Sequence, residues 1–243
     1  MPEAIARCQA FRAIVAASPV AEAWMINPLA VLHAMNGEFG LAEALLAEAH
    51  AVLDGLGGMT ANVSHLEAIV RMLMGQPGRA ETALRADVDA LATMGRTDAL
   101  ATTTAMLAQA VLAQGRIDEA GELCGAAARA TAPDDVFTEV IRRGVQASVL
   151  ARQGACADAQ ELARSALEII AATDLLTQHG DAMLRFTEVT HECMPASVQS
   201  QKESLRTALT LYEKKGNVTA AARARRSLKT SQGKASHGTE DQL

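Results

Sequence analysis

Hydrophobic residues recur along the chain with the period of an α-helix, in segments of about 14 to 18 residues separated by short turns. Only 6 prolines interrupt the 243 residues, and no long stretch shows the β-branched alternation of strands. Apolar residues make up 49% of the sequence but aromatic residues only 2%, so the core must be built from Ala, Leu, Val, Ile and Met. Ala and Leu favour helices, and small Ala side chains let helices approach closely. The pattern predicts an all-α protein.

A turn signature with helical patterning on both sides recurs along the chain. It starts at Gly37, Gly75, Gly115 and Gly154, with spacings of 38, 40 and 39 residues, and a degenerate fifth copy starts at Ala196. We expect each glycine to end the first helix of a pair, because glycine adopts the left-handed conformation at little cost. The residue two positions later is expected to pack under the turn. It is Phe39, Ile117 or Cys156 in three of the copies.

Alanine recurs five and twelve residues after each of these glycines. We expect the first alanine where the second helix crosses the first, because only a small side chain allows that approach, and the second on the same face two turns later. The two sets are Ala42, Ala80, Ala120 and Ala159, then Ala49, Asp87, Ala127 and Ala166. Asp87 breaks the second series, so the repeat that contains it is less well supported than the others.

The Gly, aromatic and paired Ala positions resemble those of the tetratricopeptide repeat. The resemblance implies stacked antiparallel helix pairs that wind into a right-handed superhelix. That repeat has a period of about 34 residues, so the longer period here implies longer helices or loops. An irregular helical bundle, the alternative, would not place Gly and Ala in step four times. We predict an all-α, right-handed tetratricopeptide-type α-solenoid of about five helix pairs plus a C-terminal capping helix.

The array is predicted to span residues 1–230 and to be followed by a disordered polar tail at 231–243. The repeats are predicted at 21–57, 60–97, 99–132, 136–173 and 179–215, and the capping helix at 218–229. The fifth turn, at Pro195-Ala196, has lost its glycine, so we expect that pair to be splayed. The array opens without a polar N-terminal cap. This suggests missing upstream repeats and predicts an apolar edge near Ile5, Phe11 and Val15 that favours self-association.

Several longer strings resemble a narrower family. They include Leu32-His33-Ala34-Met35-Asn36-Gly37, Ala132-Pro133-Asp134-Asp135-Val136, Arg143-Gly144-Val145-Gln146-Ala147, His179-Gly180-Asp181-Ala182 and the stretch from Ala208 to Arg223. Together they are similar to the C-terminal repeat region of bacterial proteins that join a class III adenylate or guanylate cyclase domain to a signalling ATPase domain. The resemblance is best after Gly115. It implies the regulatory end of such a protein, without the cyclase and ATPase domains.

No segment predicts catalysis, a cofactor or a metal site. A phosphate-binding loop needs Gly-x-x-x-x-Gly-Lys-Ser/Thr, but Leu228 stands five places before Gly233. A zinc helix needs a second His three residues after the Glu of His191-Glu192, where Pro195 stands. Asp134-Asp135 precede a helix and are expected to cap it. A hidden small-molecule enzyme would need a cluster of titratable residues with perturbed pKa values, which the sequence does not offer.

Charge and cysteine content limit which kinds of partner the chain is expected to bind and in which cellular compartment it is expected to lie. The formal net charge of −6 argues against nucleic-acid binding, and no apolar run approaches the roughly 18 to 20 residues that span a bilayer. The start of the chain lacks the basic-then-apolar order of a secretory signal. Cys8, Cys124, Cys156 and Cys193 form no Cys-x-x-Cys pair, so we expect buried thiols in a reducing cytoplasm rather than disulfides or metal ligands.

The tetratricopeptide layout places the first helix of each pair along a concave groove. The candidate groove residues are Trp24, Asn27, His65, Ile69, Met72, Gln109, Ser148 and Phe186. For each apolar one, burial in the core is an equal alternative. Basic residues gather from Lys202 to Lys234, where a polar capping role is the main interpretation and a docking surface for an acidic partner is the alternative.

The sequence predicts a non-catalytic protein-interaction or sensing module of a bacterial signalling protein. The expected partner is a protein or peptide held in the groove, not nucleic acid or a membrane. A stand-alone adaptor remains the alternative. A fragment of a transcriptional regulator is less well supported, because no helix-turn-helix segment is present.

Overall fold

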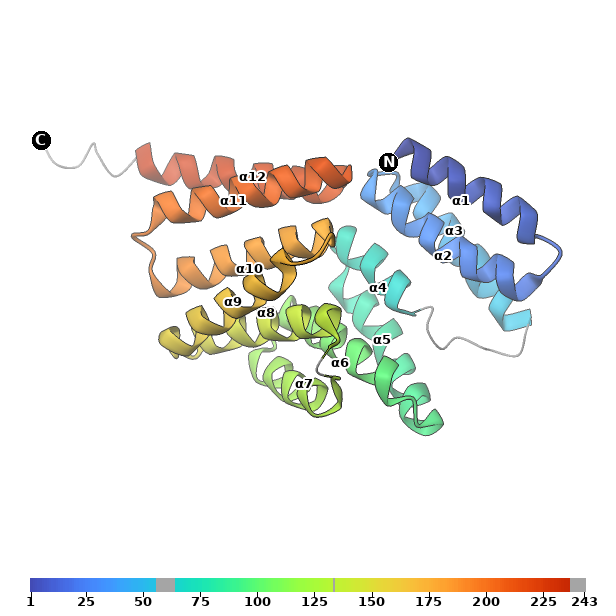
Figure 1. Cartoon of the computed structure of the whole chain (residues 1–243), viewed down its shortest axis with the longest axis horizontal. Coiled ribbons are helices and arrows are strands. Elements are labelled where there is room, and N and C mark those ends of the chain that lie inside the picture. Colours follow the sequence, from blue (N-terminus) through green and yellow to red (C-terminus); the bar gives the residue numbers. More distant parts are fainter. Residues whose placement is uncertain (56–63, 133, 237–243) are drawn as a thin grey trace, which may run out of the picture. The chain divides into compact units, whose positions relative to one another are not determined.

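The structure, a computed structural model, describes residues 1–55, 64–132 and 134–236. In these residues the chain forms twelve α-helices and no strand (Figure 1). The helices fall into two compact units, Met1–Ala132 and Pro133–Leu243. The predicted all-α solenoid of helix pairs is confirmed. The junction of the first two predicted repeats, at residues 56–63, and the end of the predicted tail, at 237–243, lie outside the described residues.

The first unit consists of one helix and three helix pairs. Helix α1 (Pro2–Val15) precedes the pairs α2 (Pro19–Met35) and α3 (Phe39–Gly55), α4 (Ser64–Leu73) and α5 (Pro77–Met94), and α6 (Thr97–Leu112) and α7 (Ile117–Ala130). Helix α2 packs on α4, and α4 packs on α6. The first helices of successive pairs therefore form a continuous row in this unit.

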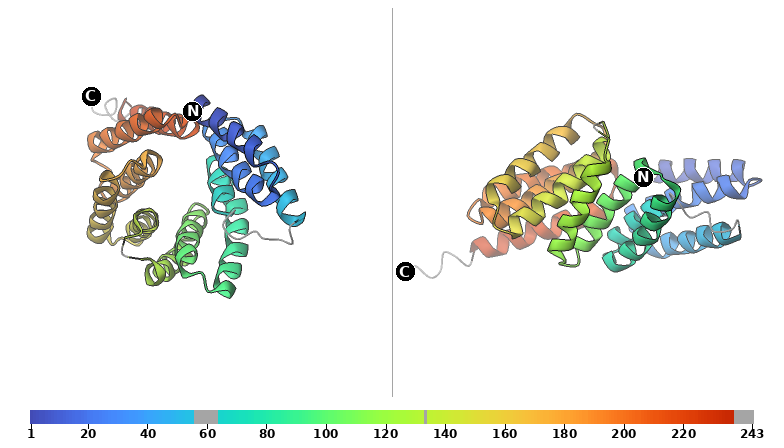
Figure 2. Two further views of the ribbon diagram at one scale, coloured as in Figure 1. Left: turned by 45° about the vertical axis from the view of Figure 1, so that its right-hand side comes forward. Right: turned by 90° about the horizontal axis from the view of Figure 1, so that it is seen from below.

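The second unit contains two helix pairs and a last helix. The pairs are α8 (Val136–Arg152) with α9 (Cys156–Ala171) and α10 (Leu176–Cys193) with α11 (Val198–Lys215), followed by α12 (Val218–Ser236). Here again the first helices, α8 and α10, pack on each other, while α12 packs on α11 (Figure 2).

Helix α12 extends further than the sequence predicts. The capping helix was expected to end at 229 and a disordered tail to begin at 231, but α12 continues to Ser236. A disordered tail stays a prediction, and polar composition alone does not end a helix. Gly233 lies within the helix, and no proline follows it in the sequence to stop the helix.

The predicted glycine turns are confirmed in all four copies. Gly37, Gly75, Gly115 and Gly154 have φ values of 83°, 72°, 81° and 82°. In each turn the amide of the next residue donates to a carbonyl five residues back, as Glu38 does to His33 at 2.9 Å. This pattern satisfies carbonyl groups that the end of the first helix would otherwise leave without a partner.

The alanine positions form the contact between the helices, as predicted. Ala42, Ala80, Ala120 and Ala159 have no exposed surface, and the second set is at most 2% exposed. That second set includes Asp87, which is buried at 2% exposure in the place of an alanine. A polar side chain at such a position needs polar partners, and His65 on α4 lies near it.

The fifth helix pair is closely packed rather than splayed. Helix α10 passes so near α11 that a Cβ atom at Gly180 would lie 2.6 Å from Cε1 of Tyr212. The Tyr212 side chain fills this contact with no exposed surface. The expectation of a splayed pair was wrong, because a glycine inside the first helix brings the helices together although the turn has lost its own glycine.

Candidate partner-binding surface

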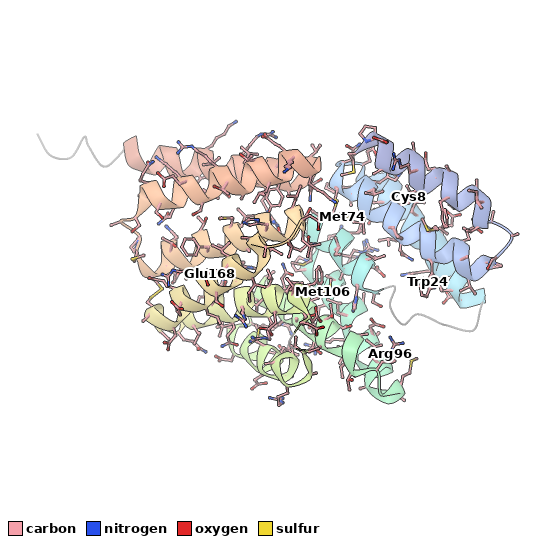
Figure 3. All side chains as sticks on the ribbon, viewed as in Figure 1. Cys8, Trp24, Met74, Arg96, Met106 and Glu168 are labelled. Carbon is pink, nitrogen blue, oxygen red and sulfur yellow. A yellow bond between two sulfur atoms is a disulfide. The ribbon has the colours of Figure 1, made fainter. Side chains whose placement is uncertain are left out.

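The eight predicted groove residues differ widely in exposure. Trp24 on α2 is 63% exposed (Figure 3), whereas Asn27 and Ser148 are buried at 1% and 4% exposure. The other five, His65, Ile69, Met72, Gln109 and Phe186, are half-buried. Asn27 and Ser148 therefore do not present their side chains for binding in this conformation. The groove stays a prediction, with its accessible candidates on α2, α4 and α6 in the first unit and Phe186 in the second.

Two of the apolar candidates contribute to the core. Ile69 packs against the cluster that includes Ala34, Leu46 and Val70. Phe186 packs against Ala147 and Ala163 in the second unit. The alternative of burial in the core therefore holds in part for these two residues, and each offers only part of its side chain to a partner.

His65 joins a polar cluster between three helices of the first unit. Its Nε2 atom contacts Oγ1 of Thr103 on α6 and lies 3.9 Å from Oδ2 of the buried Asp87 on α5. The Thr103 hydroxyl donates to the carbonyl of Ala99 at 2.8 Å, so its oxygen is an acceptor toward His65. Burial lowers the pKa of His65 below its ordinary value of 6.5, which favours a neutral imidazole with its proton on Nε2.

The geometry of this cluster does not match a catalytic relay. A relay of hydroxyl, imidazole and carboxylate needs the two oxygens on opposite ring nitrogens. Here a single nitrogen of His65 faces both Thr103 and Asp87. The cluster therefore links α4, α5 and α6, and it places half-buried His65 as a polar group on the row of first helices.

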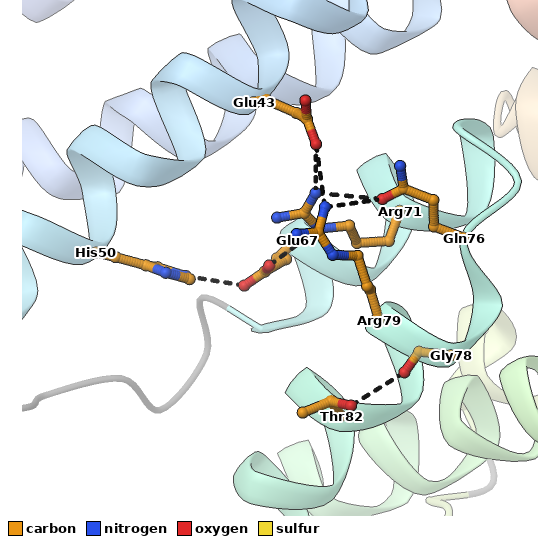
Figure 4. A network of polar contacts seen from close by, with 8 residues as sticks. All are labelled: Glu43, His50, Glu67, Arg71, Gln76, Gly78, Arg79 and Thr82. Atoms are coloured by element: carbon orange, nitrogen blue, oxygen red, sulfur yellow. Dashed lines mark hydrogen bonds and ion pairs between the residues drawn. The ribbon is translucent and has the colours of Figure 1, made fainter.

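Ion pairs connect the first two helix pairs of the first unit (Figure 4). Arg71 on α4 contacts Glu43 on α3 at 3.0 Å and Glu67 on its own helix at 3.2 Å. Arg79 on α5 reaches the same Glu43 at 3.2 Å, and His50 contacts Glu67 at 2.8 Å. Arg71 is only 11% exposed, so its charge is held among these carboxylates rather than offered to a partner.

A second network connects the next two helix pairs. Glu81 on α5 accepts from Arg116 and, at 2.7 Å each, from Arg85 and Gln114. Arg85 and Arg116 also contact Glu119 at the start of α7. The hydrogen bond from Arg116, followed by those from Arg85 and Gln114, lowers the pKa of Glu81 to about 2 from its ordinary 4.5. Glu81 is therefore a stable anion at neutral pH.

Helix α1 presents large apolar side chains to solvent. None of its residues is buried, and Phe11 and Ile14 are 50% and 75% exposed. Of the predicted apolar edge, Phe11 is exposed, whereas Ile5 and Val15 are half-buried. Self-association through this edge stays a prediction.

The buried side chain of Tyr212 on α11 takes part in contacts that connect the last three helices of the second unit. Its hydroxyl donates to Oδ1 of Asp181 on α10 at 2.6 Å. Arg223 on α12 contacts the same oxygen at 3.3 Å. Burial, together with the charge of Asp181, raises the pKa of Tyr212 above its ordinary value of 10.0, so the hydroxyl stays protonated.

Two of the four cysteines are not the buried thiols that the sequence predicts. Cys156 at the start of α9 and Cys193 at the end of α10 form a disulfide, with their Cα atoms 5.4 Å apart. Cys124 is a buried thiol as expected, and Cys8 is a half-buried one. The prediction failed because the packing of α9 on α10 brings together two residues 37 positions apart, a proximity that sequence spacing does not show.

The described residues also concern the predictions about the cap of α8, metal sites and membrane-spanning helices. Asp135 caps α8 by accepting from the amide of Thr138 at 3.0 Å, which confirms its predicted role. No group of His, Cys, Asp and Glu in these residues is arranged to hold a metal ion. None of the described helices combines the length and apolar character that crossing a membrane requires.

Sequence reasoning missed the polar cluster around His65 and the ion-pair networks. A signal for the cluster was present, because an aspartate at a core alanine position demands polar partners. The Glu and Arg residues of the networks were also visible, yet nothing in the sequence indicates which of them meet across neighbouring pairs.

Comparisons with known proteins support the fold. No protein-family model matches the chain, and no curated protein sequence matches it. A crystal structure of a Podosopora anserina putative kinesin light chain, with nearly identical TPR-like repeats, matches 78% of this chain and 94% of its own length, with 19% identity and a TM-score of 0.51. A second match, BtubC (BKLC) from P. vanneervenii, covers 99% of this chain and 92% of its own, with 14% identity and a TM-score of 0.44. The match to the putative kinesin light chain supports a tetratricopeptide-type fold, and the resemblance to cyclase–ATPase proteins stays a prediction.

Proposed function

We propose that this chain is a non-catalytic protein-interaction module that binds its partner along the row of first helices. The proposal rests mainly on one observation, the repeated packing of first helices on one another in both units. Such a row gives an extended surface that a single helix pair cannot offer. Partner-binding proteins with stacked helix repeats use surfaces of this kind, and the tetratricopeptide-type fold is consistent with that use.

The accessible residues of the row are suited to a peptide. Trp24 supplies a large exposed apolar group, and Met72 adds a flexible half-buried one. Half-buried His65 on α4 and Gln109 on α6 supply polar groups on the same row of helices. Aromatic and Met side chains are enriched where proteins bind partners.

More specifically, we propose that the module is the regulatory arm of a bacterial signalling protein with nucleotidyl cyclase and ATPase domains. The support is the set of sequence strings that resemble this family, from Leu32 to Arg223. A stand-alone adaptor is the alternative. A cytoplasmic location also stays a prediction, and the Cys156–Cys193 disulfide argues against a strongly reducing compartment.

The test is a pull-down from bacterial lysate with the purified chain as bait, followed by mass spectrometry. The surface variant carries Trp24→Glu, Met72→Glu and Gln109→Glu. The matched control carries Leu41→Glu and Met94→Glu on the second helices α3 and α5, where both residues are exposed. We expect recovery of a specific partner to fall at least about tenfold with the surface variant and to be unchanged with the control.

Two outcomes would contradict the proposal. If the control variant loses the partner equally, binding does not use the row of first helices. If the wild-type chain recovers nothing above an empty bait, the chain alone is not an interaction module. The recovered proteins are then assayed for synthesis of cyclic nucleotides from ATP or GTP. Such activity would support the proposal of a regulatory arm, and no activity would favour the stand-alone adaptor.

A further inference from the structure

Basic side chains are concentrated in the last two helices. Residues 198–236 contain nine Lys and Arg but only two acidic residues, although the whole chain carries a net charge of −6. All five lysines of the chain lie in this segment. Residues 133–197 of the same unit contain ten acidic and five basic residues. The α11–α12 hairpin is therefore the cationic part of an acidic unit.

Some of these cations already have structural roles. Arg223 contacts Asp181 at 3.3 Å, and Arg225 contacts Glu213 at 2.5 Å. Lys214 and Lys215 lie in the last turn of α11, where positive charge favours the carbonyl end of a helix. These four residues need no partner outside the chain to explain them.

Five others remain, and the side chain of one of them, Lys234, lies outside the part of the chain that the structure describes. We call the other four the cationic surface: Lys202 and Arg206 on α11, and Arg226 and Lys229 on α12. Among the residues that the structure describes, none of the four forms an ion pair. Arg206, Arg226 and Lys229 are exposed, and Lys202 is half-buried. Like charges three or four residues apart destabilise a helix, so each pair opposes the stability of its own helix. Helix capping and internal ion pairing therefore do not account for the cationic surface.

The part of this surface on α12 faces away from its packing contact. Helix α12 buries Ala220, Ala221 and Ala224, and it packs on α11. At 3.6 residues per turn, Arg226 points to the side of the helix opposite Ala224, and Lys229 lies near Arg226 one turn later. These two charges form a stripe along the outer side of α12.

We propose that the cationic surface binds an acidic segment of a partner protein. The only aromatic residue of segment 198–236 is Tyr212, which is buried, so the hairpin has no exposed ring on which nucleic-acid bases could stack. Among its large apolar residues only Val218 is exposed, so the hairpin lacks the apolar face that inserts into a membrane surface. A short acidic segment also matches a small group of cations in an otherwise acidic unit better than a long polyanion does.

This site is separate from the row of first helices, so it goes beyond the proposed function and does not depend on it. The two surfaces share no residue. A variant of one leaves the other unchanged, and failure of either proposal is therefore seen independently.

The test measures the fluorescence anisotropy of a labelled Ala-rich peptide with Glu at every third or fourth position. The full chain should bind this peptide at low ionic strength and release it as salt is added, because exposed charges are screened. The surface variant is Lys202→Glu, Arg206→Glu, Arg226→Glu and Lys229→Glu. We expect it to weaken binding by about tenfold or more, since several modest ion pairs are lost together.

A matched control separates the local surface from net charge. It reverses four cations elsewhere, Arg7, Arg129, Arg152 and Arg164, all exposed in the structure, and so produces the same change in net charge. Affinity for the peptide should change less than about threefold in this control. If the charge-reversal surface variant loses its helical circular dichroism, the four corresponding Gln substitutions replace it, because Gln retains helix propensity.

Three results would overturn the proposal. The first is no binding of the peptide by the wild-type chain at low salt. The second is an equal loss in the surface variant and the matched control, which would assign binding to net charge alone. The third is tighter binding to a single-stranded oligonucleotide, or to vesicles containing phosphatidylserine, than to the peptide.

Discussion

The two units join successive helix pairs by different kinds of contact. In the first unit, Glu43 and Glu81 connect one pair to the next through arginines that are partly exposed. In the second unit, the disulfide between Cys156 and Cys193 and the buried Tyr212 connect α9, α10, α11 and α12. Exposed ion pairs each contribute at most about 1 kcal/mol, whereas a disulfide or a buried ring contributes several times more.

The difference teaches how a core with few aromatic residues can be held together. Alanine contacts bring the helices close but bury little area per residue. Additional contacts between helix pairs therefore contribute much of the stability. Ion pairs make the first unit respond gradually to pH and salt. In the second unit, loss of either the disulfide or the Tyr212 side chain should lower the stability by a large step. Three substitutions or treatments test this contrast.

The largest effect is expected from Tyr212→Ala. The truncation leaves a cavity beside Gly180 and removes the donor to Asp181, so the free energy of unfolding should fall by about 3 to 5 kcal/mol. Urea denaturation followed by circular dichroism measures the change. The control Tyr212→Phe keeps the ring and removes only the hydroxyl, and it should cost about 1 kcal/mol. Equal losses in both variants would show that the hydrogen bond, not the ring, holds α10 and α11 together.

Reduction of the Cys156–Cys193 disulfide should have the next largest effect. Opening a loop whose ends are 37 residues apart gives the unfolded chain more freedom, so reduction should destabilise the protein by about 2 to 4 kcal/mol. Thermal unfolding with and without a dithiol measures the change, and hydrogen exchange should show it in the second unit. Cys193→Ser should lower stability to the same level and abolish the response to dithiol. A response that persists in this variant would contradict the assignment.

The smallest effect is expected from Glu81→Gln in the first unit. Its folded-state pKa of about 2 lies below the ordinary 4.5, so Glu81 stabilises the fold above pH 4.5, and this contribution is lost as the pH falls toward 2. The variant should be less stable than the wild type by about 1 kcal/mol at pH 7, with the difference vanishing near pH 2 and shrinking in high salt. Urea denaturation across this pH range measures it. Glu122→Gln, at an exposed residue of α7, is the control, and an equal effect there would contradict the role of the network.

The features that the sequence predicts correctly are those that depend only on residues within one repeat. Gly37 and its three counterparts are required by a left-handed turn, and Ala42 and its counterparts by a close helix crossing. Both requirements are local, so they recur at a fixed spacing and are visible without a structure. The same logic predicted the helix cap at Asp135.

The features that sequence misses depend on which side chains meet between helices far apart in the chain. The fifth pair was expected to be splayed because its turn lacks glycine, yet Gly180 sets the contact from inside α10. The disulfide and the Glu81 network likewise depend on partners about 35 residues away. Of the predicted groove residues, Asn27 and Ser148 are buried because periodicity distinguishes the faces of a helix only coarsely.

The confinement of every lysine to residues 202–234 has a practical consequence for handling the protein. Reagents that acylate side-chain amines will react only at the α11–α12 end of the chain. Coupling the protein to a sensor chip through its lysines would attach it at α11 and α12 and obstruct the cationic surface. A protease specific for lysine would cut only within this last segment, and it would leave residues 1–202 as one uninterrupted fragment for mapping which surface retains a bound partner.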